Sequence, residues 1–401
     1  MSLNGMVSET RRLPETVLRE ELPRVEVVII GGGIQGLSVA AHLVDAGVTE
    51  VTVLESRSMV GTESSAMSAR MLMMQCDNDT KMRLAVFSYL KYLRHLDRMN
   101  IDPHMDRIGS LSIGGSDLRA QAQTMIEVRR SFGVQTELLA SDEIHKFDGT
   151  IALEDDDVGI FCPDDARIDV GAVIAGLRRF VLGGGARIRT DTSAVGFRVV
   201  GSAVTGVLTS RGDVMDCDAV VNAANARAAE IMKMIDLSLH VENARRTVFI
   251  VRRPSGFAAT GPLVEDAERV CYYRHYPDDG NDHILIGYGK EVSQDSELDS
   301  AEGLPWQTVR AAAGHRFPAL VTDEPVDRWS GIRSLSPDFL PCVGRVKGIE
   351  NLVLCCALGG EGVQFAPATG YAVAELISND LAEVACMDLS ALDPNREGIL
   401  T

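Results

Sequence analysis

Runs of hydrophobic residues separated by glycines predict the first structural unit of the chain. Residues 25–30 (VEVVII) form a short apolar run rich in β-branched side chains, which is typical of a buried parallel strand. After three glycines, residues 34–46 repeat apolar side chains with helical spacing, and Gly47 ends that helix. A second strand is expected at residues 51–54. Residues 1–23, which are polar and charged, are expected to form a loosely attached lead-in.

The same kind of pattern predicts several further elements. Apolar positions with helical spacing indicate helices at residues 79–99, 119–132, 141–147 and 165–181. Residues 190–225 alternate in a way that predicts a short antiparallel meander leading to a buried strand at 219–224. Longer strands follow between residues 238 and 330, in TVFIVRR, CYYRHYP and HILIGYG. The chain then returns to a strand, a glycine-rich turn and a final helix in ENLVLCCALGGEGVQFAPATGYAVAELISND.

This order of elements predicts a mixed α/β fold of two interleaved domains, since 401 residues exceed one compact core. A Rossmann-type nucleotide-binding domain is expected from residues 20–85, 158–235 and 331–395. A substrate domain built on an antiparallel sheet is expected from residues 86–157 and 236–330.

Composition and charge narrow the choice of partners. The chain is 45% hydrophobic and 24% charged, as is usual for globular proteins, and it has no apolar run of membrane-spanning length. Its net charge of −18 argues against nucleic acid and anionic membrane as partners. The eight cysteines are scattered without a CxxC motif, so neither a metal site nor a disulfide framework is expected, and a cytoplasmic location fits.

The first unit carries a nucleotide-binding motif. Gly31, Gly33 and Gly36 form GxGxxG between the first strand and its helix, where glycines permit a tight turn and close approach to a pyrophosphate. Glu55 ends the next strand, in position to accept hydrogen bonds from ribose hydroxyls. A glutamate there disfavours the 2′-phosphate of NADP, which leaves FAD and NAD as candidate cofactors.

Four further stretches separate these cofactors. They are GTESSAMSARML, CPDDARIDVGAVIAGL, GVLTSRGDVMDCDAVVNAANARA, and GIRSLSPDFLPCVG with the following LGGEGVQFAPATG. Together with GxGxxG they resemble the FAD-dependent amine and amino-acid oxidoreductases, the group of D-amino-acid oxidase, glycine oxidase and sarcosine oxidase. The resemblance extends from residue 25 to residue 380. It implies FAD as cofactor, and an NAD-dependent dehydrogenase would leave the closing glycine segment without a purpose.

The resemblance also implies how FAD is held. Some family members link the flavin to a cysteine, where this chain has Gly331, and others to a histidine, where Ser65 is the closest match. Non-covalent FAD is therefore expected. The implied FAD-binding residues are Gly31, Gly33, Ile34, Gln35, Gly36, Glu55, Ser56, Arg57, Ser64, Ser65, Ala66, Met67, Val195 (through its backbone, to adenine), Ala223, Ala224, Arg333, Gly360, Glu361, Gly362, Val363 and Gln364.

The closing glycine segment has a physical rationale for a flavin. Reduction leaves negative charge near the N1 and C2 carbonyl of the ring. A tight turn at Gly360 and Gly362 before the final helix would direct backbone amides and a helix N-terminus at that charge. A plain strand–helix connection is the alternative.

The resemblance implies catalytic residues as well. Arg333 matches the arginine of the family's Gly-(Leu/Ile)-Arg motif, whose guanidinium grips the substrate carboxylate. The alternative is a structural ion pair, for example with Asp338. Tyr272 or Tyr273 is expected to donate to the carboxylate, and strand alternation lets only one of them face the pocket. The other candidates are His275, on the Tyr273 face, and Arg70, in the segment beside the flavin.

The implied activity is oxidation of a small amino acid or N-methyl amino acid by hydride transfer to flavin N5, which gives an imine that hydrolyses. Gln364 stands where sarcosine oxidases have a lysine, which weakens that identification. No lysine can be assigned a place near the flavin, so oxygen and another carrier both remain as electron acceptors. A 2-hydroxy-acid oxidase or dehydrogenase and a non-catalytic flavoprotein subunit are the alternatives.

Overall fold

The expected first unit forms as predicted. The computed structural model describes residues 25–76, 78–277, 280, 282–289, 292–293, 303–378 and 389–401, so the lead-in at 1–23 lies outside the described residues. Strand β1 (Val27–Ile30), helix α2 (Ile34–Asp45) and strand β2 (Val51–Leu54) follow one another. Side chains alternate across β1, so Val27 and Ile29 enter one hydrophobic core whereas Val28 and Ile30 enter another. Strand β1 is therefore buried on both faces, as its apolar run indicated.

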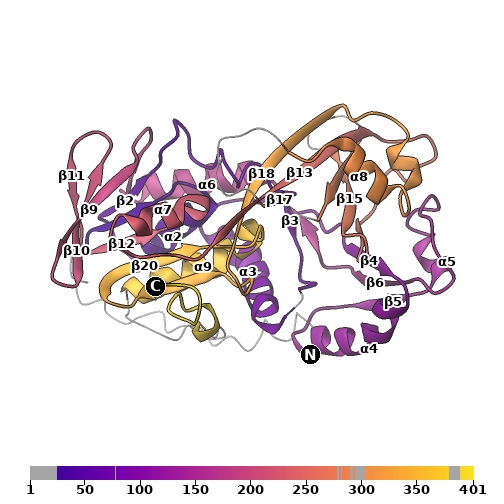
Figure 1. The fold of residues 1–401 in the computed structure, drawn as a ribbon, viewed down its shortest axis with the longest axis horizontal. Helices are drawn as coiled ribbons and strands as arrows, with labels where there is room; N and C mark the ends of the chain where they lie inside the picture. Colours follow the sequence, from indigo (N-terminus) through magenta and orange to yellow (C-terminus); the bar gives the residue numbers. More distant parts are fainter. Residues whose placement is uncertain are drawn as a thin grey trace.

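This unit lies in a six-stranded sheet. The strand order is β19-β20-β12-β1-β2-β8, with bounds β19 (Cys342–Val346), β20 (Ile349–Cys356), β12 (Ala219–Asn222) and β8 (Arg187–Arg189). All neighbours pair in parallel except β19, which is antiparallel to β20. Strands from the beginning, middle and end of the chain thus share one sheet (Figure 1).

Helices cover one face of this sheet. Helix α2 packs against α9 (Gly362–Ser378) and α6 (Val170–Gly183), and α3 (Asp79–Arg98) packs against α9. The helix expected at 165–181 begins at Val170 because the Asp169 side chain caps it, accepting a hydrogen bond from the amide of Ala172 at 3.0 Å. Residues 166–167 instead form strand β7 (Ala166–Arg167), paired with β3 (Met71–Leu72).

The predicted meander covers the opposite face. It consists of β9 (Ala194–Val200), β10 (Ala203–Thr209) and β11 (Val214–Asp216), paired antiparallel. The short helix α7 (Ala228–Lys233) and the 3-10 turn η1 (Asn225–Arg227) follow β12. Side chains of these elements share a core with Val28 and Ile30 of β1.

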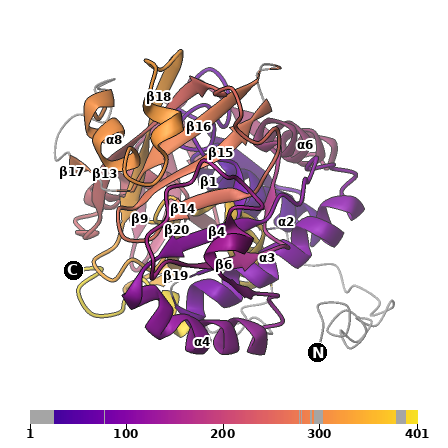
Figure 2. The ribbon, with the colours of Figure 1, turned by 90° about the vertical axis from the view of Figure 1, so that its right-hand side faces the viewer.

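A second, largely antiparallel sheet forms the other half of the molecule. Its order among the described residues is β17-β13-β16-β15-β14-β4-β6-β5, and β18 also pairs with β13. The bounds are β17 (Val292–Ser293), β13 (Glu242–Arg252), β16 (His283–Tyr288), β15 (Cys271–Tyr276), β14 (Leu263–Asp266), β4 (Ser110–Gly114), β6 (Val158–Cys162), β5 (Glu137–Leu139) and β18 (Asp327–Leu335). Figure 2 shows β16, β15, β14, β4 and β6 succeeding one another.

Helices α4 (Ser116–Ser131), α5 (Ser141–Ile144) and α8 (Trp306–Ala313) lie beside this sheet, together with the 3-10 turn η3 (Pro318–Val321). One face of the sheet packs on α8 through residues such as Phe249, Tyr273 and Ile286. The other face carries Val248, Tyr272 and Leu285. The two faces therefore have different roles, because one is filled by core packing and the other is directed towards the nucleotide-binding half.

The fold class is confirmed as mixed α/β, with a Rossmann-type sheet and an antiparallel sheet interleaved along the chain. The residue ranges expected for the two domains stay a prediction. Sheet membership follows a slightly different partition, since β6 and β18 pair within the second sheet and α3 packs against α9 of the first half. None of the described helices combines the length and apolar character needed to cross a membrane.

Candidate active site

A cavity of about 1170 Å³ lies between the two sheets. Its walls come from the turn after β1, the end of β2, residues 61–76, the segment after β12, strands β13, β14, β15 and β18, and the turn before α9. The carboxyl ends of β1, β2 and β12 meet here, which is where open parallel sheets bind their ligands. The cavity joins a nucleotide-binding edge to one face of the second sheet.

The glycine turn is packed too tightly for other residues. Gly31 has φ +110°, and a Cβ there would come within 2.7 Å of the carbonyl oxygen of Ala223. A Cβ at Gly36 would overlap the carbonyl oxygen of Gly31. Both glycines thus allow β1, α2 and β12 to approach closely, whereas a Cβ at Gly33, at the start of α2, would make only an ordinary contact with the Ser65 hydroxyl at 3.5 Å.

The N-terminus of α2 opens onto the cavity. Its N-cap, Gly33, has no side chain to cap the helix, so first-turn amide donors and the positive end of the helix dipole face the cavity. The hydroxyl of Ser65 accepts a hydrogen bond from the amide of Ile34 at 3.1 Å. Backbone amides of Gly32 (2.9 Å) and Arg57 (2.7 Å) hold the Glu55 carboxylate at the end of β2. This arrangement fits a pyrophosphate with a ribose beyond it.

Most of the predicted site residues line this cavity. They are Gly31, Gly33, Ile34, Gln35, Glu55, Ser56, Arg57, Ser64, Ser65, Met67, Arg70, Ala223, Ala224, Tyr272, Arg333, Gly360, Glu361, Gly362, Val363 and Gln364. Gly36, Ala66, Val195, Tyr273 and His275 do not line it. Gly36 is packed beneath the turn, and the Val195 side chain is 53% exposed on β9, although its neighbour Ala194 reaches the cavity.

Two residues of the lining have a clear local geometry. Asn225 has φ +41° and so adopts the left-handed conformation that asparagine tolerates best after glycine. A Cβ at Gly331 would come within 2.8 Å of the Met67 Cβ, so any side chain there would displace the residue 61–70 segment.

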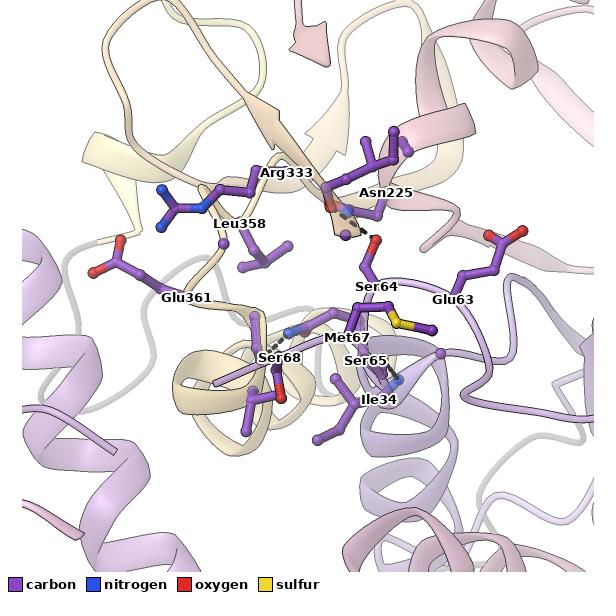
Figure 3. Close-up of a pocket in the computed structure, with 18 of the residues that line it drawn as sticks. Ile34, Glu63, Ser64, Ser65, Met67, Ser68, Asn225, Arg333, Leu358 and Glu361 are labelled. Atoms are coloured by element: carbon purple, nitrogen blue, oxygen red, sulfur yellow. Dashed lines mark hydrogen bonds between the residues drawn. The ribbon is translucent and has the colours of Figure 1, made fainter. Parts of the chain in front are cut away.

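The turn before α9 brings Arg333 to the cavity. Gly359 and Gly360 have φ +61° and +83°, and a Cβ at Gly360 would overlap the guanidinium of Arg333. Figure 3 shows the Arg333 side chain extending to the same side of the cavity as Glu361. The Glu361 carboxylate forms an ion pair with Lys81 of α3 at 3.2 Å. The Gln35 side chain donates to the carbonyl of Gly362 at 2.6 Å, so the two helix N-termini are joined directly.

The alternative partner suggested for Arg333 is bound elsewhere. Asp338 pairs with Arg396 of the C-terminal segment at 2.6 Å. The hydrogen bond from Arg396 lowers the pKa of Asp338 to about 2. Asp338, the acid suggested as a partner of Arg333, is thus engaged by Arg396.

Of the two adjacent tyrosines, Tyr272 faces the cavity. The backbone pairs Tyr272 with Gly287 of β16, and the tyrosine ring occupies the space where a Gly287 side chain would be. Tyr273 lies on the opposite face, where its hydroxyl donates to Asp148 at 3.3 Å and its pKa is raised well above its usual value by burial. His275 shares that face and packs on Phe257, and burial lowers its pKa.

The lining also holds charged residues that the sequence did not indicate, and three of them come from α3 and the second sheet. Arg246 of β13, Glu265 of β14 and Lys81 of α3 all line the cavity. Burial raises the pKa of Glu265, opposed by the positive charge of Arg246 and a hydrogen bond from Ser112. The sequence did indicate the helix at residues 79–99 in whose first turn Lys81 lies. Arg246 and Glu265, by contrast, come together only through sheet pairing.

A buried network supports the wall at residues 73–76. The Asp165 carboxylate accepts hydrogen bonds from the amide of Met74 (2.7 Å) and the hydroxyl of Ser110 (2.6 Å). Gln75 in turn donates to Ser110 at 2.6 Å and accepts from Arg129 at 2.7 Å. Burial raises the pKa of Asp165 to about 6, against these hydrogen bonds. The described residues contain no group of side chains arranged to bind a metal ion.

Comparisons with known proteins agree with this geometry. The family described as "DAO: FAD dependent oxidoreductase" matches residues 26–376. The chain is 26% identical to the 4-methylaminobutanoate oxidase (formaldehyde-forming) of Paenarthrobacter nicotinovorans over 93% of this chain and 45% of that protein. It is also 26% identical to the glycine oxidase of Geobacillus kaustophilus, over 88% and 93% of the two chains.

The fold resembles that of the solved L-proline dehydrogenase from P. horikoshii. The TM-score is 0.83 at 23% identity, over 93% of this chain and 97% of that one. The chain spans less than half the length of several of the curated proteins that it matches, the 4-methylaminobutanoate oxidase among them.

Proposed function

This chain belongs to the family of FAD-dependent oxidoreductases, and from that premise we propose that it oxidises a small α-amino acid or N-methyl amino acid at the carbon–nitrogen bond. One observation carries the proposal. A continuous cavity connects the glycine turn and Glu55 to Arg333 and Tyr272. A dinucleotide bound at one end would thus have its reactive ring beside a carboxylate-binding pair at the other.

FAD is the cofactor, held without a covalent bond. The N-terminus of α2, whose N-cap Gly33 has no side chain, suits the pyrophosphate and Glu55 suits the adenosine ribose. Gly331 has no side chain with which to form a link, and Met67 fills the adjoining space. When bound, FAD supplies the acceptor for the substrate's hydride.

The residues of the chain bind and orient the substrate. The Arg333 guanidinium presents paired N–H donors, which match a carboxylate bidentately. Tyr272 provides a hydroxyl on the facing sheet, and the missing side chain of Gly287 gives its ring a fixed place. Two donors from different elements would fix the orientation of the substrate's α-carbon. Arg70 lies in the same lining.

Anaerobic reduction of the flavin by a substrate panel tests this proposal. The purified protein should be yellow and release FAD on denaturation. Its visible absorbance should bleach with a small amino acid or N-methyl amino acid and stay unchanged with 2-hydroxy acids. Bleaching only by 2-hydroxy acids would reassign the substrate class, and no bleaching by any compound would favour a non-catalytic flavoprotein subunit.

Re-oxidation of the bleached protein identifies the electron acceptor. Rapid recovery of colour in air would make oxygen the acceptor, whereas slow recovery that an artificial electron acceptor accelerates would indicate a dehydrogenase. A cytoplasmic location, inferred from the cysteines of the sequence, stays a prediction.

A further inference from the structure

Glu265 and Tyr272 lie side by side on the cavity wall. They are direct partners across β14 and β15, and Tyr272 is in turn the partner of Gly287. Side chains of directly paired residues on antiparallel strands have Cβ atoms about 4.5–5.5 Å apart. Both residues line the cavity. The wall therefore offers a carboxylate acceptor immediately beside a hydroxyl donor.

This pairing complements an α-amino acid. Such a substrate carries its ammonium and carboxylate groups on the same α-carbon. Tyr272 can donate a hydrogen bond to the carboxylate, and Glu265 can accept one from the ammonium group. The two side chains are adjacent on one wall and match that spacing. Arg246 on the same face of the sheet adds positive charge near Glu265, so the cavity presents both positive and negative charge to a zwitterion.

The other carboxylates that line the cavity are already engaged. Glu55 is held by two backbone amides, Glu63 pairs with Arg57 at 2.8 Å, and Glu361 pairs with Lys81 at 3.2 Å. Glu230 is 3.6 Å from Arg227. Glu265 instead has a long hydrogen bond from the Ser112 hydroxyl, at 3.5 Å. Of these acids, Glu265 is the one that lines the cavity from the second sheet, beside Tyr272.

An ammonium group must lose a proton before the neighbouring carbon can give up hydride, because only a nitrogen lone pair stabilises the positive charge that develops. We propose that Glu265 binds the substrate's ammonium group and accepts this proton. The N–H bond breaks, its electron pair stays on nitrogen, and the proton forms an O–H bond on the Glu265 carboxylate. This inference rests on the proposed function and assigns a further catalytic residue to it.

The surroundings of Glu265 suit a group that gains and loses a proton. Burial raises its pKa, while Arg246 on β13 and the Ser112 hydroxyl on β4 act in the opposite direction. Its neighbour Asp266 raises the pKa further but points to the other face, where it binds Arg316 at 3.2 Å and Arg269 at 3.3 Å. Tyr272 is the facing group on β15. A carboxyl with a raised pKa is a better proton acceptor near neutrality than an exposed one.

Glu265→Gln tests the inference by stopped-flow reduction of the flavin without oxygen, at saturating concentrations of the amino acid that bleaches the wild type. The glutamine keeps the size of the side chain and cannot accept the proton. We expect the variant's reduction rate to fall by about 100-fold or more at pH 7, the usual effect of losing a general base. The rate should recover towards the wild-type value as the pH approaches the pKa of the substrate's own ammonium group.

The shape of the pH profile decides the outcome. The inference is supported if, in Glu265→Gln, the fall of the reduction rate at low pH shifts to the pKa of the substrate's ammonium group. It would be overturned if the reduction rate falls at the same pH in both proteins and is lowered by the same factor at every pH in the variant. If no amino acid bleaches the wild type, the proposed function fails first, so the two failures are distinguishable.

Two further measurements separate chemistry from folding. Propionate, a carboxylate without an amine, should perturb the flavin spectrum of Glu265→Gln at the same concentrations as in the wild type, and loss of that binding would instead make Glu265 a structural residue of the cavity. Glu268→Gln is the matched control, because Glu268 follows β14 but does not line the cavity. Its carboxylate accepts a hydrogen bond from the amide of Gly115 at 2.9 Å. Its pH profile should equal that of the wild type.

Discussion

At the scale of single residues, Tyr272 and Tyr273 occupy different environments although they are adjacent in sequence. Alternation along β15 directs Tyr272 to the cavity and Tyr273 into the core beneath α8. The same alternation places His275 with Tyr273 and the fully buried Arg274 with Tyr272, where Arg274 donates to the carbonyl of Ala69 at 2.9 Å. One strand therefore supplies both a cavity-facing hydroxyl and a support for the residue 61–70 segment.

Removing one hydroxyl from each tyrosine should have opposite effects. Tyr272→Phe is expected to raise KM about tenfold without changing Tm, since a hydrogen bond contributes about 1 kcal/mol and more to a charged group. Tyr273→Phe removes the bond to Asp148, so Tm should fall while KM stays constant. Steady-state kinetics and thermal melting of the two variants check this, and the reverse pattern would show that Tyr273 serves the site.

Arg333→Leu should weaken substrate binding strongly and leave the cofactor in place. We expect KM to rise by about 100-fold or more, since losing a charged hydrogen-bond partner costs about 3 kcal/mol. FAD content, measured by absorbance after purification, should equal that of the wild type. Arg198→Leu on β9 is the control for loss of one charge, because Arg198 pairs with Asp216 far from the lining. Loss of FAD from Arg333→Leu would make that arginine a cofactor ligand or a structural residue.

At the scale of elements, the glycine turn before α9 determines where Arg333 lies. Gly359 and Gly360 both have positive φ, but only at Gly360 would a Cβ overlap the Arg333 guanidinium. At Gly359 the nearest atom to such a Cβ is the Glu361 Oε2, 3.6 Å away. The two glycines thus share a backbone requirement and differ in what surrounds them.

This difference gives a matched pair of variants. Gly359→Ala and Gly360→Ala should both lower stability by about 1–2 kcal/mol, because alanine is strained at positive φ. Only Gly360→Ala should also raise KM, since it displaces Arg333. Melting curves and kinetics of the two proteins provide the measurement. Equal KM values in both variants would show that Arg333 does not bind substrate from its place over Gly360.

The loop after β6 predicts a pH dependence of stability. The pKa of Asp165 is raised from 3.8 to about 6 in the folded protein. The folded state therefore binds this proton more tightly than the unfolded state, and Asp165 destabilises the fold increasingly as the pH rises from about 4 through 6. The change is at most about 3 kcal/mol, from 1.36 kcal/mol per pKa unit.

Asp165→Asn should remove that dependence. The asparagine breaks part of the hydrogen-bond network with Met74 and Ser110, so the variant starts from a lower stability at pH 4.5. Its free energy of unfolding relative to the wild type should nevertheless improve as the pH rises to 7.5. Urea unfolding at several pH values measures this, and a constant difference between the two proteins would show that Asp165 titrates normally.

At the scale of the whole molecule, the cavity separates the two sheets and the cofactor would connect them. FAD should therefore stabilise the fold: at a concentration 1,000 times its Kd it adds about 4 kcal/mol. FAD-free protein should melt at a lower temperature and recover its Tm when FAD is added. FMN, which lacks the adenosine that Glu55 is positioned to bind, should restore Tm much less. Equal recovery with FMN would place the nucleotide contacts elsewhere.

Much of this could be predicted from sequence, where the controlling interactions are local. The bounds of β1, α2 and β2 follow from apolar periodicity and from glycines that no other residue can replace. Family motifs then led to FAD, and placed Arg333 and the closing glycines near one another. Regular hydrogen bonding and short-range sterics determine such features within about 30 residues, so the sequence alone determined the unit of β1, α2 and β2.

The tertiary structure decided what depends on contacts between distant segments. Sequence alternation established that one of Tyr272 and Tyr273 faces the pocket, but only pairing with Gly287 and Glu265 shows that it is Tyr272. Asp338, five residues from Arg333, binds Arg396 instead. Arg246 and Glu265 share the cavity because β13 and β14 join one sheet through β16 and β15. Strand register is set by packing across the whole fold, and no local pattern in the chain encodes it.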